Sequence, residues 1–166
     1  MIQIARIRYG VGVFLLFSAA CSPPPPRDTH DADVRSITES EVLWVRHWRL
    51  RDAERILSHY SEDATLSIPN MPPAVGREAI RETVKEIVRD GNLTFTFEPQ
   101  RVEVAKSGDY GYAEGPYSLT MTDLVNKKAA TDQGTFLRVY RKQLDGGWRV
   151  LRDMRASRLA SGAVAQ

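Results

Sequence analysis

The chain has 166 residues, enough for one domain, with 23 Lys and Arg against 21 Asp and Glu and a single cysteine. Two of the basic residues, Arg6 and Arg8, belong to an N-terminal leader, so the remainder carries 21 charges of each sign. Such a neutral balance gives no reason to expect binding to nucleic acid, and one cysteine excludes an internal disulfide.

The N-terminus has the parts of a secretion signal. Arg6 and Arg8 precede an apolar stretch over residues 9–17, and the small residues 18–20 lead directly to Cys21. The apolar stretch is shorter than the roughly 20 residues that span a bilayer. The pattern resembles a bacterial lipoprotein signal, which implies a signal peptide over 1–20 and a lipid on Cys21. Cleavage by ordinary signal peptidase, which would release the protein, is the alternative.

The residues after Cys21 read as a spacer. Ser22 follows the cysteine, which in a cell with two membranes resembles the pattern of outer-membrane lipoproteins. The proline run 23–26 is stiff and extended, so residues 21–36 are predicted to form a lipid-anchored tether. We therefore expect a cell-envelope protein, either a periplasm-facing outer membrane lipoprotein or a secreted protein. Residues 37–158 are expected to fold, and 159–166 to be a disordered tail.

Helical signals open the expected domain. Thr38 and Glu41 have the spacing of a capping box, which predicts a helix from there to about Leu50. Asp52 is placed to cap a second helix over 53–60.

The rest of the domain alternates between one helix and several strands. A short strand is predicted over 64–68, and apolar residues at helical spacing predict a third helix over 77–89. Period-two alternation then predicts four strands: one over 93–97 that continues through Val102 and Val104, and others over 110–121, 134–142 and 148–154. The expected fold class is α+β, a cone-shaped, curved antiparallel β-sheet packed on three N-terminal helices around a conical cavity.

The order of short motifs carries a family resemblance over residues 37–158. The motifs are Trp44, Arg51-Asp52-Ala53, Tyr60-x-x-Asp63-Ala64-Thr65, Gly76-Arg77-Glu78-Ala79-Ile80, Ser107-Gly108-Asp109-Tyr110-Gly111-Tyr112 and Asp145-Gly146-Gly147-Trp148. Together they resemble the nuclear transport factor 2-like superfamily, and within it the SnoaL-like or ketosteroid isomerase-like domains. The resemblance implies the cone-shaped fold and, as in many relatives, a homodimer formed through the open face of the sheet.

The isomerase machinery of these relatives is not retained. Where the isomerases have a carboxylate base, the resemblance places Ile68, and where they have a helical Tyr it places Trp44. Their protonated Asp falls at 134–136, which holds no carboxylate. Neither an Ile nor an indole moves a proton near neutral pH.

Other enzymes of the superfamily suggest a different catalytic set. They use an Asp on the last strand, and epoxide hydrolases pair it with a second Asp and an Arg, which implies Asp153 and Asp132 with Arg152 or Arg138 nearby. His47, on the first helix, is a further candidate base. The alternative is structural: Asp132 caps a turn, Asp153 pairs with an arginine, and His47 lies half exposed at the helix edge.

Three functions remain open. The first is binding of a small apolar or aromatic molecule in the cone, lined by Ile68 and by the aromatic residues Trp44, Trp48, Tyr60, Tyr117 and Phe136; the alternative for these is ordinary core packing. The second is an enzyme of the cyclase, isomerase or hydrolase type. The third is a dimerisation or protein-interaction module. No cofactor is expected, and no metal site, because no two histidines have ligand spacing.

Overall fold

The computed structural model describes residues 29–123 and 125–158. The predicted signal peptide, Cys21, the proline run and the predicted tail over 159–166 lie outside the described residues. Among the described residues, no helix has both the length and the apolar character needed to cross a membrane.

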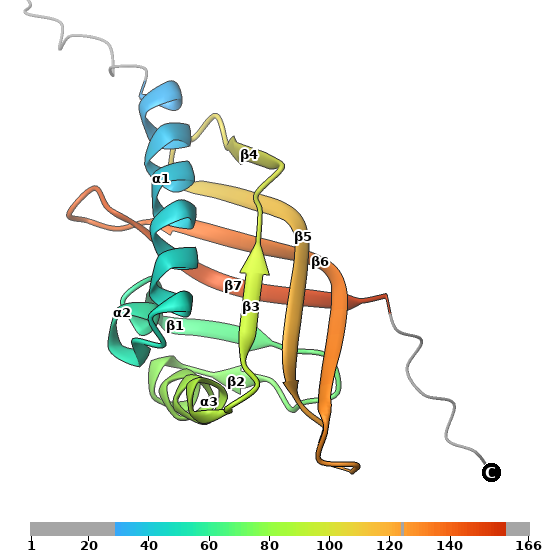
Figure 1. Ribbon diagram of the computed structural model, residues 1–166. Coiled ribbons are helices and arrows are strands. Elements are labelled where there is room, and N and C mark those ends of the chain that lie inside the picture. Colours follow the sequence, from blue (N-terminus) through green and yellow to red (C-terminus); the bar gives the residue numbers. More distant parts are fainter. Residues whose placement is uncertain (1–28, 124, 159–166) are drawn as a thin grey trace, which may run out of the picture.

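Three helices lie against one face of a seven-stranded sheet (Figure 1). The helices are α1 (His30–Arg49), α2 (Ala53–Leu57) and α3 (Arg77–Arg89). The strands are β1 (Tyr60–Ser67), β2 (Ala74–Val75), β3 (Thr94–Phe97), β4 (Arg101–Val104), β5 (Tyr110–Thr122), β6 (Ala129–Lys142) and β7 (Trp148–Ser157). The strand order is β2-β1-β7-β6-β5-β3, and β4 also pairs with β5. The α+β class and the helices-first order are therefore confirmed.

The sequence predicts an antiparallel sheet, but the sheet is mixed. β1 runs parallel to β7, whereas every other strand pair described is antiparallel. Parallel neighbours need a long connection, and the segment from β2 to β6, including α3, lies between β1 and β7 in the chain. This pairing places Asp153 of β7 beside Leu66 of β1.

The first helix begins earlier than predicted. Residues 30–36, expected to be tether, are the first part of α1, and Asp33 is anchored to the sheet by Trp148 Nε1 (3.1 Å) and Lys142 Nζ (2.8 Å). Thr38 does not cap the helix, because its hydroxyl donates to the Val34 carbonyl inside it (2.8 Å). The expected domain start at residue 37 is therefore wrong, and the folded body includes all of α1.

The long strands β5 and β6 bend sharply, which curls the sheet around α1 (Figure 1). Two glycines in these strands lie where another backbone segment approaches closely. A Cβ at Gly134 would lie 1.9 Å from the Ala156 carbonyl oxygen, and one at Gly115 would lie 2.0 Å from that of Glu98. Only glycine allows the backbones to approach this closely, so this packing of the strands requires glycine at both positions.

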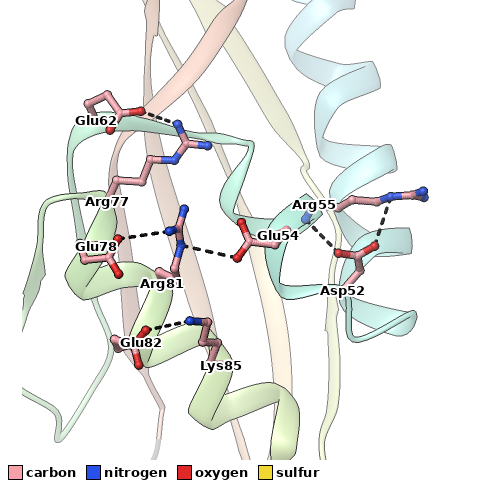
Figure 2. A network of polar contacts seen from close by, with 9 residues as sticks. All are labelled: Asp52, Glu54, Arg55, Glu62, Arg77, Glu78, Arg81, Glu82 and Lys85. Carbon is pink, nitrogen blue, oxygen red and sulfur yellow. Dashed lines mark hydrogen bonds and ion pairs between the residues drawn. The ribbon is translucent and has the colours of Figure 1, made fainter.

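The exposed side of α2 and α3 carries ion pairs (Figure 2). Arg81 bridges Glu78 (3.2 Å) and Glu54 (3.5 Å), while Arg77 pairs with Glu62. All of the carboxylates involved are well exposed, so each pair contributes little to stability. This charged surface is an ordinary solvated face, and the groups of chemical interest lie on the other side of the helices.

Candidate functional site

A buried guanidinium stands at the centre of the cone. Arg138 of β6 is 0 % exposed and reaches across to two carboxylates from different elements. Its Nη1 donates to Glu41 Oε2 of α1 at 2.5 Å, and its Nε donates to Asp153 Oδ1 of β7 at 3.3 Å. Both carboxylates are themselves fully buried. Arg138 thus ties the helix to two adjacent strands by charge.

Two tyrosines complete this ion cluster. Tyr140 donates to Glu41 Oε1 at 2.6 Å, and Tyr60 donates to Asp153 Oδ2 at 2.8 Å. Burial raises the pKa of Glu41 more than Arg138 and Tyr140 lower it, so its neutral form is favoured relative to a free glutamate. Burial alone would lower the pKa of Arg138, but the Glu41 and Asp153 charges raise it. The arginine therefore stays charged and neutralises its neighbours.

Aromatic rings enclose the Arg138 guanidinium. Its Cζ lies 4.4, 4.0 and 4.2 Å from the ring centroids of Trp44, Phe97 and Phe136. Cation–π attraction at these distances partly replaces lost hydration. Tyr60 packs edge-on against Trp44 at 5.0 Å. These contacts fill the middle of the cone with the protein's own side chains.

A second arginine lies in the cone with its donors unused. The Arg155 side chain on β7 is 1 % exposed, and its Cζ lies 4.3 Å from the Phe95 ring and 5.9 Å from that of Trp48. None of its three guanidinium nitrogens has a hydrogen-bond partner among the described residues. The same holds for Trp44 Nε1, Trp48 Nε1 and Arg138 Nη2. The cone is therefore rich in donors and short of acceptors.

A buried hydrogen-bond chain runs along the side of α1. Ser40 Oγ lies 3.1 Å from His59 Nδ1, and His59 Nε2 lies 3.0 Å from His47 Nδ1. His59 also stacks on Trp44 at 4.8 Å. Burial is the main cause that lowers the pKa of His59 to about 3, and it lowers the pKa of His47 as well. Both rings are neutral at ordinary pH and brace α1 against the start of β1.

The larger pockets of the described residues lie along the sheet and along the flank of α1. Two adjoining pockets of about 650 and 530 Å³ share Pro116 and Arg158, and are lined by β5, β6 and by β7 or β3. A third of about 960 Å³ lies between the flank of α1 and the segment after β3. Phe136 and Arg155 line part of the first pocket, and Phe97 and Tyr117 line part of the second. Trp44, Trp48 and Asp153 line none of the three. The open apolar cavity expected from the sequence is therefore not seen in these three pockets, and ligand access to the interior requires side chains to move.

Comparison with known proteins identifies the family. A family model of the SnoaL-like domain matches residues 43–150. This chain belongs to the SnoaL-like domain family. The match includes Trp44 and Arg138, and Glu41, Asp153 and Arg155 lie just outside its bounds. No curated protein matches the chain in sequence.

Solved structures of low identity share the SnoaL-like fold. A ketosteroid isomerase-like protein from Erwinia carotovora atroseptica has a TM-score of 0.67 at 19% identity, covering 77% of this chain and 98% of that one. A nuclear transport factor 2-like superfamily protein from Salmonella enterica has a TM-score of 0.64 at 16% identity, with coverages of 82% and 98%. A Novosphingobium aromaticivorans protein with a cystatin-like fold has a TM-score of 0.61 at 22% identity, covering 81% of this chain and 86% of that one.

Within this SnoaL-like domain, the predicted carboxylates lie apart. Asp153 is in the Arg138 cluster, whereas partly buried Asp132 accepts from Tyr117 Oη (2.6 Å) and Ser157 Oγ (2.5 Å). The second carboxylate beside Arg138 is Glu41 and not Asp132. His47 is buried rather than half exposed, and its described side-chain partner is a histidine.

The predicted lining residues of the SnoaL-like domain are mostly core. The aromatic residues Trp44, Trp48, Tyr60, Tyr117 and Phe136 are all buried, and Ile68 packs partly buried against them. Ile68 stands where the resemblance places the isomerase base, and Gly134 and Phe136 where it places the protonated Asp.

Sequence reasoning missed Glu41, His59 and Arg155. A signal for Glu41 existed, because it shares the buried face of α1 with Ile37, Trp44 and Trp48 at spacings of four, three and seven residues. A carboxylate on such an apolar face requires a buried partner. Its reading as half of a capping box hid that requirement.

Proposed function

We propose that this SnoaL-like domain binds a small, largely apolar or aromatic molecule in its cone. One observation carries the proposal: six buried donor atoms, on Trp44, Trp48, Arg138 and Arg155, have no acceptor among the described residues. Buried donors in folded proteins nearly always have a partner, whether protein, water or ligand. A ligand that brings acceptors on a flat apolar body fits a cone lined by rings and donors.

The contacts among these side chains support a single site. Trp44 covers the Arg138 guanidinium at 4.4 Å, and Trp48 lies 5.9 Å from that of Arg155. Both arginines lie within 4.0 Å of the Asp153 carboxylate. A ligand between α1 and the sheet would thus reach several unused donors at once.

The binding experiment uses 2-naphthol as a neutral aromatic probe. We expect saturable quenching of tryptophan fluorescence in the purified protein, with a higher dissociation constant in Phe97→Ala, since Phe97 lies 6.2 Å from Trp44 and 5.6 Å from Phe136 in the cone. Leu43→Ala, an exposed position on α1, should bind as the wild type does. Absence of saturable binding, or equal effects of the two variants, would count against the proposal.

An enzyme of the cyclase, isomerase or hydrolase type is the second candidate. It is favoured by Glu41, whose pKa is raised by burial and which shares Arg138 with Asp153. Two carboxylates around one arginine resemble the hydrolase set, with Glu41 in the place expected for Asp132. It ranks lower because Arg138 neutralises both carboxylates and Tyr60 and Tyr140 occupy their remaining oxygens.

We also propose that the protein is exported and held at the cell envelope by a lipid on Cys21. The supporting observations are the basic, apolar and small-residue order of residues 1–20 and the proline run that follows. Cys21→Ser should move the protein from the membrane fraction to the soluble fraction of fractionated cells, with Ser22→Ala as the control. An unchanged membrane fraction in the cysteine variant would refute the anchor.

A further inference from the structure

Unlike Arg138, Arg155 donates no side-chain hydrogen bond to any of the described residues. Its Nη2 lies 3.8 Å from Asp153 Oδ2, within ion-pair range but beyond a hydrogen bond. That oxygen already accepts from Tyr60 Oη at 2.8 Å, and the other carboxylate oxygen accepts from Arg138 Nε at 3.3 Å. Both oxygens of Asp153 therefore already accept hydrogen bonds from residues other than Arg155.

The neighbours of Arg155 define a half-apolar, half-ionic corner. Phe95 of β3 lies under the guanidinium, and Trp48 of α1 lies beside it with its own indole N–H unpaired. A guanidinium presents five N–H donors in a planar fork and is not deprotonated in proteins. Its natural complement is a planar acceptor that takes two parallel N–H bonds, which is the geometry of a carboxylate.

We propose that Arg155 is the anion-recognition residue of the cone and receives the carboxylate of a ligand whose body is apolar or aromatic. This inference rests on the proposed ligand-binding function and names its ligand class. The rings of Phe95 and Trp48 then contact the ligand body, and Trp48 Nε1 is placed to add a hydrogen bond to the same acceptor. A strongly hydrated phosphate fits less well, because the corner offers one arginine and two rings.

The rival role for Arg155 is packing. Its aliphatic stem and its stacking on Phe95 could brace the core without any ligand. The two roles differ in what Arg155→Met does: methionine keeps much of the apolar volume and removes the fork. If Arg155 recognises the ligand, Arg155→Met loses the preference for carboxylates while the melting temperature is kept or raised, because buried N–H donors without acceptors have been removed.

The test compares 2-naphthoate with its neutral analogue 2-naphthamide by isothermal titration calorimetry on the purified full chain. We expect the wild type to bind the carboxylate at least about tenfold more tightly than the amide, which is the size of one charge-assisted bidentate pair. Arg155→Met should bind both probes with equal affinity. Arg152→Met, the same change at an exposed site of the same strand, should keep the preference.

The outcomes separate this inference from the binding function on which it rests. Equal binding of both probes by the wild type, or a preference that survives Arg155→Met, overturns the anion site and leaves ligand binding in place. No binding of either probe overturns both. If Arg155→Met does not fold, Arg155→Lys keeps the charge without the fork: a fall in naphthoate affinity with unchanged naphthamide affinity supports the inference, and unchanged affinities for both overturn it.

Discussion

At the scale of single residues, we expect stability to depend on buried contacts between residues that lie far apart in the sequence. Glu41 meets Arg138, 97 positions along the chain, and both are 0 % exposed. Glu41→Leu would leave the Tyr140 hydroxyl without its acceptor and Arg138 with Asp153 alone. We expect a loss of about 3–5 kcal/mol in the free energy of unfolding, the usual cost of breaking a buried pair.

Denaturant unfolding measures the Glu41 effect, and Glu39→Leu is the matched control. Glu39 is exposed on the same helix, so its substitution should change the unfolding free energy by less than about 0.5 kcal/mol. Equal stabilities of the two variants would show that the Arg138 cluster does not hold α1 to the sheet.

His59 makes the protein sensitive to mild acid. Its folded pKa is lowered to about 3 from an ordinary value of 6.5, so the unfolded chain takes up the proton first as the pH falls. The stabilisation is complete above pH 6.5 and is lost progressively below it, by about 2 kcal/mol between pH 7 and pH 5. Its packed neighbours Ser40, His47 and Trp44 carry no negative charge that would offset protonation.

The pH effect is measured by denaturant unfolding at pH 7, 6 and 5. His59→Gln should flatten the decline of the unfolding free energy with falling pH. The same slope in wild type and His59→Gln would contradict the assignment. Asp33 and Asp63 do not affect the measurement between pH 7 and pH 5, because their lowered pKa values place their titration at more acidic pH.

At the scale of elements, the close packing of β6 against β7 depends on glycine. A Cβ at Gly134 would overlap the Ala156 carbonyl oxygen at 1.9 Å and approach Tyr117 Cε1 at 2.9 Å, so the strands would have to separate. We expect Gly134→Ala to lower the free energy of unfolding by about 1–3 kcal/mol or more. Gly91→Ala is the control, because its Cβ meets nothing within 4 Å. Thermal melting that ranks the two variants equally would refute this account.

The elements that could be predicted are those specified by local sequence. α3 has the predicted bounds because its apolar residues recur at helical spacing, and Asp52 caps α2 as expected, accepting from Arg55 N at 3.0 Å. The start of α1 was mispredicted because Thr38 and Glu41 satisfy a capping pattern, while Glu41's actual partners lie on β6.

The β1–β7 pairing and the candidate site could not be predicted, because both depend on contacts between residues far apart in the sequence. The parallel β1–β7 contact joins strands that are separated in the chain by β2 to β6 and α3, and no local periodicity encodes it. The candidate site is assembled by that contact and by the β6–β7 register, which places Arg138 opposite Asp153. Sequence reasoning named both residues, but it could not choose Arg138 over Arg152 or replace Asp132 by Glu41.

At the scale of the whole molecule, the sheet face turned away from the helices suggests self-association, which we propose as the third function. Met154, 39% exposed, lies on this face with partly buried Leu137 and Pro116, and all three line the 650 Å³ pocket there. Apolar side chains along a shallow trough are complementary to a second copy related by a two-fold axis. Light scattering after size exclusion should therefore report twice the monomer mass for the purified protein.

A matched pair of methionines tests the dimer face. Met154→Glu places a charge in the trough and should yield monomers, because a two-fold interface would bring two such carboxylates together. Met71 is 40% exposed but lies after β1, away from this face, so Met71→Glu should leave the mass unchanged. A monomeric wild type, or equal masses for the two variants, would rule out this face.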